Sequence, residues 1–264
     1  MEKDRPKVAV VTGGASGIGK AVALKFFEEH HCVVVCDKDA KALKNMKMND
    51  TPSGTEIWPL YLDVSLDRNV KILFSKIYKK FGRIDILVNS AGITTPPTPL
   101  IKKTDLDFRR VIDIHLMGTF YCMREAASYM LKRKFGRIIN ISSRAGVFGL
   151  YGKCNYSAAK AGIIGLSQTA AKELFHRGIT VNVIAPGGIT TPFSSRAIGE
   201  KKNLNARLDR VVGDPGDVAH LVSFLAKEES YLINGVVILL DAGGYLWHGL
   251  DETFSRVVKQ THAF

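Results

Sequence analysis

The stretch Val8-Ala-Val-Val-Thr-Gly-Gly-Ala-Ser-Gly-Ile-Gly19 joins a short apolar, β-branched run to a glycine-rich turn, and a helix-like segment follows it. Glycines permit a tight turn and let the backbone approach a bound group closely. The free N–H groups and the positive end of the helix dipole favour an anion at such a turn. A strand, a glycine turn and a helix in this order predict the pyrophosphate site of a dinucleotide, although a purely structural turn would use the same glycines.

Apolar runs alternate with helix-like segments along the rest of the chain. The runs lack a clean period-2 polarity, which is expected of strands that helices cover on both faces. We therefore expect an α/β fold, a single-domain, Rossmann-type doubly wound parallel sheet of about seven strands with helices on both faces. The expected strands are Val8–Thr12, Cys32–Cys36, Ile57–Leu62, Ile84–Asn89, Arg137–Ser142, Thr180–Ala185 and Val236–Leu240, and the expected helices span about 17–30, 39–48, 66–81, 104–133, 155–177 and 215–227.

Bulk composition excludes several classes of protein. The 264 residues fit one domain, residues 1–264, and no apolar run is long enough to span a membrane. Four cysteines without a CxxC pair, and no histidine cluster with metal spacing, predict a cytoplasmic protein with reduced thiols and no metal. The net charge is +12, but the basic residues lack interleaved aromatic side chains, so we expect no nucleic-acid partner.

An acidic residue closes the second expected strand. Asp37 follows Gly19 by 18 positions, where a carboxylate can accept hydrogen bonds from the adenosine ribose and repel a 2′-phosphate. This predicts NAD as the cofactor in preference to NADP, although the nearby cations Lys20 and Lys38 would soften that preference. The alternative is that Asp37 only caps the helix that follows.

Three polar residues have the types and spacing of a proton-transfer site. Tyr156 and Lys160 share a helix face because they are four residues apart, and Ser143 follows an expected strand 13 residues before Tyr156. The neighbouring ammonium, a helix N-terminus and an oxidised nicotinamide would all favour the phenolate of Tyr156. Tyr156 could then exchange a proton with an alcohol or a ketone, while Ser143 polarises the reacting oxygen and Lys160 also holds the nicotinamide ribose.

Taken together, these motifs resemble those of the short-chain dehydrogenase/reductase family, in the same order and over about residues 7–245. They comprise Thr12–Gly19, Asn89-Ser-Ala-Gly92, Ser143, Tyr156-x-x-x-Lys160 and Pro186-Gly187, and the stretch Gly178–Gly187 resembles 3-oxoacyl-carrier-protein reductases and related NAD-dependent alcohol dehydrogenases. The resemblance implies a cofactor site that adds strand-end residues to the glycine turn. Its expected members are Gly13, Ser16, Gly17, Ile18, Gly19, Asp37, Asp63, Val64, Asn89, Ala91, Gly92, Tyr156, Lys160, Pro186, Gly187, Ile189 and Thr191.

Three positions depart from the family pattern. Ser90 replaces an asparagine of the Asn89 motif, and the late Asp-Gly-Gly pattern reads Asp241-Ala-Gly-Gly244. More important, His115 stands where the family carries a catalytic asparagine that holds a water beside the lysine. His115 could complete that relay, titrate near neutral pH, or be a packed core residue.

The residues expected to contact the substrate rest on fewer signals. Position alone suggests a pocket with hydrophobic character formed by Ala145, Phe148, Tyr151, Cys154, Gly188 and Phe193. Residues 187–213 are long for a connection and are expected to form a substrate lid, the alternative being a surface insertion without a role. Residues 245–264 form a C-terminal extension whose role the sequence does not decide.

Three functions fit these residues. The first is an NAD(H)-dependent oxidoreductase that interconverts a secondary alcohol and a ketone, with a small-molecule substrate. The second is a 3-oxoacyl-carrier-protein reductase, for which the basic residues Lys134 and Arg177 could attract an acidic carrier protein. The third, from another class, is a dinucleotide sensor without catalysis, which would not need Ser143, Tyr156 and Lys160.

Apolar stripes on two of the expected helices bear on assembly. Burial against the sheet accounts for part of each stripe. In the resembled family these helices form a four-helix interface between subunits, which implies a homotetramer, with a dimer as the alternative. The stripes are Phe120, Met123, Ala127 and Met130 on one helix and Ile163, Leu166, Ala170 and Leu174 on the other.

Overall fold

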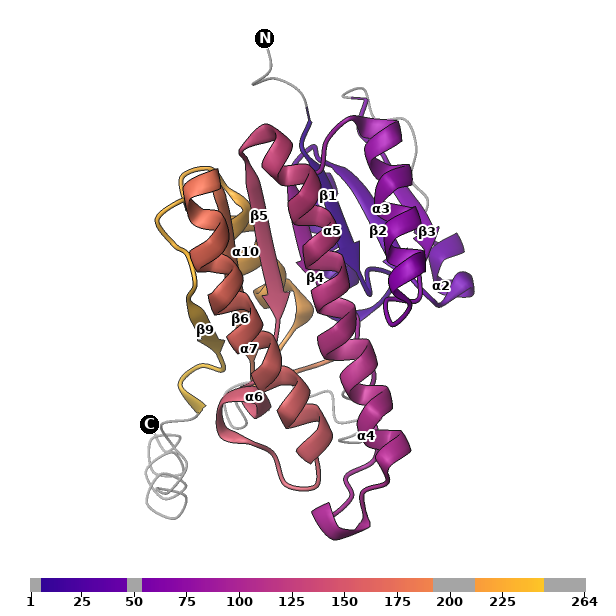
Figure 1. Ribbon diagram of the computed structural model, residues 1–264, viewed down its shortest axis with the longest axis vertical. Helices are drawn as coiled ribbons and strands as arrows, with labels where there is room; N and C mark the ends of the chain where they lie inside the picture. Colours follow the sequence, from indigo (N-terminus) through magenta and orange to yellow (C-terminus); the bar gives the residue numbers. More distant parts are fainter. Residues whose placement is uncertain (1–5, 47–53, 192–211, 245–264) are drawn as a thin grey trace, which may run out of the picture.

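A computed structural model describes residues 6–46, 54–191 and 212–244 of the chain. Seven parallel strands form one sheet in the order β3-β2-β1-β4-β5-β6-β9, and the strand order reverses between β1 and β4 (Figure 1). The strands are β1 (Val8–Thr12), β2 (Cys32–Asp37), β3 (Ile57–Tyr61), β4 (Ile86–Asn89), β5 (Gly136–Ile141), β6 (Ile179–Pro186) and β9 (Val237–Leu240). The expected doubly wound sheet and all seven of its strands are confirmed.

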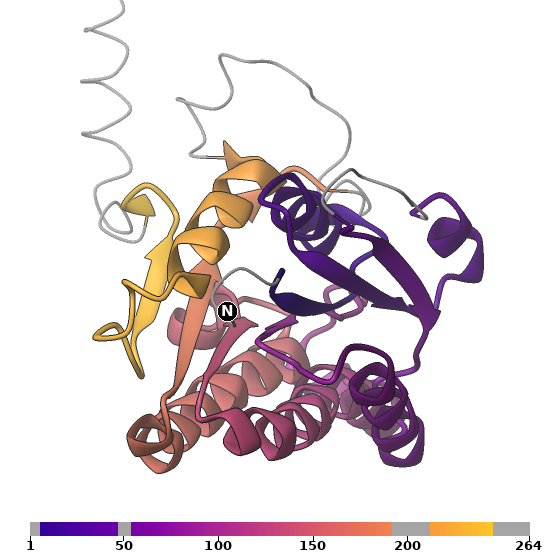
Figure 2. The ribbon, with the colours of Figure 1, turned by 90° about the horizontal axis from the view of Figure 1, so that it is seen from above.

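Helices cover both faces of this sheet (Figure 2). One face is covered by α1 (Gly17–Glu28) and α10 (Pro215–Ala226), and the other by α3 (Asp67–Phe81), α5 (Gly118–Arg133) and α7 (Cys154–Leu174). Alternate residues of each strand point into the two layers: Val10 packs with Phe74 on one side, and Val11 with Phe26 on the other. Burial of both strand faces explains why the runs read as continuously apolar in the sequence.

The elements between the main layers differ from the expected ones. The expected helix 104–133 is divided into α4 (Asp105–Ile112), a π-helical turn at Asp113–Met117, and α5. Helix α2 (Ala40–Lys44) is shorter than expected, and α7 passes into a 3₁₀ turn at Phe175–Arg177. Two short elements were missed, a 3₁₀ turn at Leu100–Lys102 and α6 (Arg144–Phe148), because each is too short to show a helical period.

The predicted lid falls mainly outside the described residues, as does the C-terminal extension. At the two ends of the lid segment, β7 (Gly188–Ile189) pairs in parallel with β8 (Val212–Gly213). Thr190 also donates its main-chain N–H to the Gly213 carbonyl. The two ends of that segment therefore lie side by side beyond the carboxyl end of β6.

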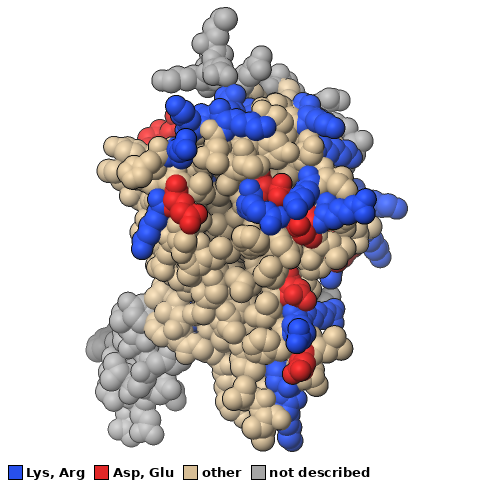
Figure 3. Space-filling model, in the orientation of Figure 1, with Lys and Arg blue, Asp and Glu red and all other residues tan. Residues whose placement is uncertain are grey.

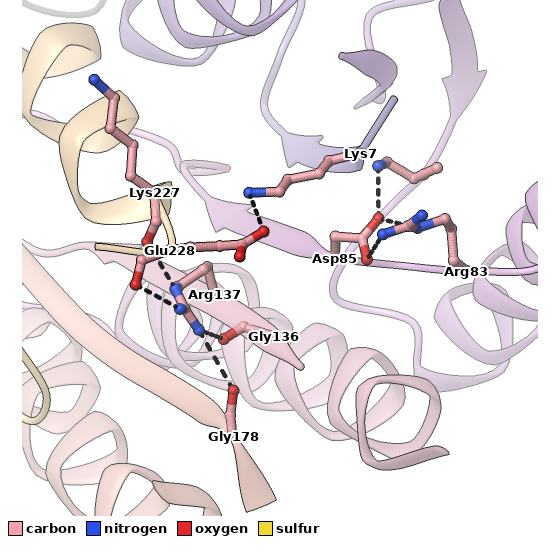
Figure 4. Close-up of polar contacts among 9 residues, drawn as sticks. Lys7, Arg83, Asp85, Gly136, Arg137, Gly178, Lys227 and Glu228 are labelled. Carbon is pink, nitrogen blue, oxygen red and sulfur yellow. Dashed lines mark hydrogen bonds and ion pairs between the residues drawn. The ribbon is translucent and has the colours of Figure 1, made fainter. Parts of the chain in front are cut away.

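At the amino edge of the sheet, buried charged side chains form hydrogen bonds within the protein (Figure 4). The fully buried Asp85 carboxylate accepts hydrogen bonds from the Val8 N–H at 2.8 Å and from Nε and Nη2 of Arg83 at 2.6 and 2.9 Å. Among the described residues, the buried Arg137 guanidinium donates only to main-chain carbonyls, those of Gly136, Gly178, Lys227 and Glu228. These buried charges are thus satisfied within the protein, and the opposite, carboxyl edge is where a doubly wound sheet binds its ligand.

Candidate active site

A cavity of about 370 Å³ opens at the carboxyl edge of the sheet, where the strand order reverses between β1 and β4. Crevices at this position are where open α/β sheets bind their ligands. The cavity brings together the loops that follow β1, β4, β5 and β6. Among the residues predicted for a cofactor or for catalysis, those that line it are Gly13, Ser16, Gly17, Ile18, Asp37, Asp63, Val64, Ala91, Gly92, His115, Ser143, Tyr156, Lys160, Pro186, Gly187, Ile189 and Thr191.

The glycine turn is folded tightly enough to exclude side chains. A Cβ atom at Gly19 would lie 2.2 Å from the Gly13 carbonyl oxygen, and one at Gly13 would lie 2.8 Å from Cα of Ala91. Helix α1 starts at Gly17, its first turn holds no acidic residue, and the Ser16 side chain makes no capping hydrogen bond. The helix N-terminus is therefore available to an anion, and these residues fit the pyrophosphate of a dinucleotide.

The carboxylate of Asp37 is fixed beside this turn. One oxygen accepts a hydrogen bond from the Ala15 N–H at 3.1 Å, and the other accepts one from the Asp39 N–H at 3.0 Å. The N-cap of α2 is Asp39, whose side chain accepts from the N–H groups of Lys41 and Ala42, so the alternative role of Asp37 as the helix cap is wrong. Asp37 instead presents a negative charge to the cavity, with Lys38 next to it in the lining.

Strand β5 holds helix α7 through consecutive residues. Asn140 donates to Oγ of Ser167 at 2.8 Å, and the Ser142 hydroxyl donates to the Lys160 carbonyl at 2.8 Å. Between them, the Ile141 carbonyl accepts a 2.7 Å hydrogen bond from Nζ of Lys160. These contacts fix the rotation of α7 about its axis, and with it the direction of the Tyr156 side chain one turn earlier.

Ser143 lies opposite Tyr156 because it begins α6. Its hydroxyl accepts a hydrogen bond from the Ala145 N–H at 3.1 Å, and its side chain is hydrogen-bonded to the Tyr156 phenol. Nζ of Lys160 lies 5.6 Å from the centre of the Tyr156 ring. The three side chains thus meet in the cavity, as their spacing in the sequence predicts.

Burial shifts the protonation equilibria of Tyr156 and Lys160. Burial raises the pKa of the Tyr156 phenol above its ordinary 10.0, and the hydrogen bond with Ser143 only partly opposes this. Burial also lowers the pKa of the Lys160 ammonium from 10.5 to about 7. In the protein alone, burial therefore favours the protonated phenol, which can donate a proton, and the phenolate expected with an oxidised nicotinamide stays a prediction.

His115 lies in the π-helical turn and packs edge-on against the Tyr156 ring, with the ring centres 5.3 Å apart. Its Nε2 atom lies 3.0 Å from the Ile93 nitrogen and 2.9 Å from the Ile93 oxygen, whereas Nδ1 is buried without a partner among the described residues. Burial, and then the charge of Lys160, lower the pKa of His115 from 6.5 to about 3. Burial thus favours a neutral His115 ring at neutral pH.

Comparison with known proteins identifies the family. A family model described as short chain dehydrogenase matches residues 7–202. The chain belongs to the short-chain dehydrogenase/reductase family. It is an oxidoreductase that acts on CH–OH groups with a nicotinamide dinucleotide.

Similar proteins cover nearly all of this short-chain dehydrogenase. The 3-oxoacyl-[acyl-carrier-protein] reductase FabG of Thermotoga maritima is 39% identical over 241 residues, 90% of this chain and 97% of the relative. The (2S)-[(R)-hydroxy(phenyl)methyl]succinyl-CoA dehydrogenase subunit BbsD of Thauera aromatica is 37% identical, covering 92% and 98%. Among solved structures, levodione reductase (28% identity, TM-score 0.82, 91% and 97% coverage) and ElxO with NADP bound (33%, 0.82, 90% and 98%) share the fold.

Some predicted residues do not line the cavity. Gly19 lies behind the turn, and Asn89 points into the sheet, where it donates to Oδ1 of Asn140 at 2.8 Å. Of the residues suggested for the substrate, only Gly188 lines the cavity, and Phe193 is outside the described residues. Ala145 is buried beside α7, Cys154 is half-buried outside the lining, and Phe148 and Tyr151 are 53% and 86% exposed, because α6 turns that segment outward.

The cavity also contains residues that sequence reasoning missed. Ile93 and Thr94 follow β4, while Leu150 and Lys153 precede α7. Lys153 is only three residues before Tyr156, and a charged residue so close to the proton donor was an available signal. In the parts of the chain that the structure describes, no group of three or more His, Cys, Asp or Glu side chains could hold a metal ion.

We expect the buried His115 to make stability depend on pH. The folded-state pKa of about 3 lies below the ordinary 6.5, so the neutral ring's contribution is complete above pH 6.5 and is lost as the pH falls towards 3. In urea unfolding, wild type should lose about 3 kcal/mol more than His115→Asn between pH 7 and pH 4. The exposed His176→Asn should follow wild type, and parallel curves for wild type and His115→Asn would contradict this.

Proposed function

We propose that this enzyme interconverts a secondary alcohol and a ketone, and that the ketone is the 3-oxo group of an acyl thioester. The observation that supports the proposal most is the meeting of Ser143, Tyr156 and Lys160 in the cavity beside the glycine turn. Two relatives support the narrower substrate class, since their names denote a 3-oxoacyl chain on a carrier protein and an acyl chain on CoA. We therefore favour the thioester over a simple alcohol.

In the proposed reduction, the bound nicotinamide supplies the hydride and this chain supplies the proton. The Tyr156 hydroxyl donates its proton to the carbonyl oxygen, and the Ser143 hydroxyl donates a hydrogen bond to the same oxygen. Because the pKa of Lys160 is about 7, its ammonium can return a proton to Tyr156 near neutral pH. In this proposal His115 serves the relay only as a neutral ring that holds a water at Nδ1, and wild-type turnover in His115→Ala from pH 6 to 9 would remove that role.

Carrier recognition by Lys134 and Arg177 needs more than one subunit. Both residues lie where a helix ends at the amino edge of the sheet, Lys134 just before β5 and Arg177 just before β6. The cavity lies at the opposite edge, so in one subunit these cations are far from its mouth (Figure 1). We thus propose the thioester as the substrate without assigning the carrier to this pair.

We expect Tyr156→Phe to lower kcat for 3-oxobutanoyl-CoA by about 1,000-fold, because the ring remains but the proton donor is lost. The rate is followed by NADH absorbance, and dinucleotide binding, followed by fluorescence, should persist. Tyr151→Phe is the matched control, since it removes a phenol that is 86% exposed and outside the cavity. Retention of more than about a tenth of kcat by Tyr156→Phe would contradict the assignment.

We also propose that NAD is preferred to NADP. Both carboxylate oxygens of Asp37 are held by main-chain N–H groups, so the charge cannot easily turn away from an adenosine 2′-phosphate. Lys38 in the lining acts in the opposite direction, and the solved structure of ElxO contains NADP. The fixed negative charge at the end of β2 is the feature that supports NAD here.

The cofactor preference can be measured as the ratio of kcat/KM for NADH to that for NADPH. We expect a ratio above about 10 in wild type and a fall of at least about tenfold in Asp37→Ser, since a tenfold change needs only about 1.4 kcal/mol of repulsion. Asp39→Ser, which removes a nearby carboxylate outside the cavity but keeps a capping side chain, should keep the wild-type ratio. A wild-type enzyme that favours NADPH would overturn the proposal.

We further propose a homotetramer in which α7 faces another subunit. The apolar stripes are largely used inside the subunit, since Met123, Met130 and Ile163 are buried. The exposed face of α7 instead carries small or uncharged side chains, and Figure 3 shows an area without charges over α7 and the lower part of α5. Small residues on a helix permit the close approach of a second helix. The exposed residues before the last turn of α7 are Ala158, Ala161, Gly165, Gln168 and Thr169, and the exposed Lys172 and Glu173 lie in its last turn.

We expect Gly165→Arg to reduce the molar mass in light scattering from that of a tetramer to that of a dimer or monomer. Apart from the backbone of α7 itself, no atom of the described residues lies within 4 Å of a Cβ built at Gly165, so the substitution has open space there. Lys71→Glu on α3 should leave the mass unchanged. A wild-type monomer, or a Gly165→Arg tetramer, would contradict this interface.

We also propose that the protein works in the cytoplasm. All four cysteines are free thiols, which supports a reducing compartment such as the cytoplasm. Within the described ranges, no helix is long and apolar enough to cross a membrane. A disulfide in the protein purified under non-reducing conditions would count against the cytoplasmic assignment.

A further inference from the structure

A buried lysine lies in the cavity near the proton donor and takes no part in the proposed proton transfer. Lys153 is 8% exposed, lines the cavity, and precedes α7 by one residue and Tyr156 by three. Its Nζ atom donates to Oγ1 of Thr94 at 3.3 Å and to the Thr95 carbonyl. Both partners are neutral oxygens, so the charge of this ammonium is solvated only by dipoles.

A second cation, Lys103, and the Thr95 hydroxyl lie on the loop that contacts Lys153. Lys103 is close enough for its charge to act, after burial, to lower the pKa of Lys153. Nζ of Lys103 and Oγ1 of Thr95 are both shielded from solvent and have no hydrogen-bond partner among the described residues. Over the same ranges, no ion pair includes Lys103 or Lys153.

The loop that carries these groups is fixed to the start of α7. The Thr98 N–H donates to the Gly152 carbonyl at 2.8 Å, and a Cβ at Gly152 would lie 3.0 Å from Cβ of Pro97. Gly152 also has a positive φ of 71°, a conformation that a side chain disfavours. Thr94 and Lys153 therefore line the cavity from two segments that are fixed to each other, and Thr95 lies behind them, where its carbonyl accepts a hydrogen bond from Lys153.

A buried ammonium without a negative partner is costly, and a second positive charge nearby adds to that cost. An oxyanion in the cavity would pair with Lys153 and would also be attracted by the charge of Lys103. We infer that Lys153, supported by the charge of Lys103, binds an oxyanion, a carboxylate or a phosphate, that the substrate carries in addition to its thioester and close to the carbon that reacts at Tyr156. The inference rests on the proposed function in placing the reacting carbon beside Tyr156 and in taking the substrate to be a thioester.

Two pairs of small ketones test this site and distinguish the two anions. The first pair is 3-oxobutanoate and its methyl ester, and the second is hydroxyacetone phosphate and hydroxyacetone. Wild type should favour the anionic member of one pair by at least about tenfold in kcat/KM, mainly through KM, since a charge-assisted hydrogen bond contributes about 1.5 to 3 kcal/mol. Which pair shows the preference identifies the anion.

Variants then assign the preference to residues. Lys153→Met should bring the ratio of the anionic to the neutral ketone to about one, and Lys103→Met should lower it at least about threefold, whereas Lys71→Met on α3 should keep it. Because burial lowers the pKa of Lys153, the preference should also weaken at a lower pH than that of an ordinary lysine. Thermal unfolding of each variant confirms that it is folded.

A binding measurement separates the site from turnover. In the Tyr156→Phe enzyme with NADH bound, the preferred anion should quench or enhance NADH fluorescence with a dissociation constant at least about tenfold below that of its neutral partner, and Lys153→Met should remove this difference. The anion site would be overturned if the two members of each pair had the same kcat/KM and the same dissociation constant. If 3-oxobutanoyl-CoA is reduced in that case, the proposed function still holds; if no ketone or thioester is reduced, the proposed function fails independently of the binding result.

Discussion

The hydrogen bond from Nζ of Lys160 to the Ile141 carbonyl connects the chemistry of this protein to its fold. It joins the end of the central strand β5 to the helix that carries Tyr156, and flanking contacts from Asn140 and Ser142 hold the same helix in register. Because the strand is buried on both faces, its end cannot shift without disturbing both helical layers. The position of the proton donor is therefore set by the packing of the whole sheet.

Burial at this edge has a different effect on each ionisable group. It raises the pKa of the Tyr156 phenol, lowers the pKa of Lys160 to about 7 and keeps His115 neutral. In each case the charged form is penalised by loss of water. A buried phenol with these neighbours is suited to donating a proton. The buried ammonium of Lys153 would in turn be stabilised by an anion.

The relatives and the geometry agree on the class of reaction, whereas the substrate is a separate question. Family membership establishes an oxidoreductase that uses a nicotinamide dinucleotide. Other residues of the cavity lining, such as Thr94, Leu150 and Lys153, belong to loops and not to the sheet. Loops carry specificity in this way because they can change without altering the packing of the strands.

The sequence by itself determined the sheet, the glycine turn and the group of Ser143, Tyr156 and Lys160, since each follows from local patterns: apolar runs, glycine at tight turns, and the four-residue helical repeat. Only the tertiary structure decided the protonation states, the outward direction of Phe148 and Tyr151, and the pairing of Asn89 with Asn140. It also brought the charge of Lys103, 50 residues away in the chain, close enough to act on Lys153. These features depend on which distant segments exclude water from a side chain, and no local pattern contains that information.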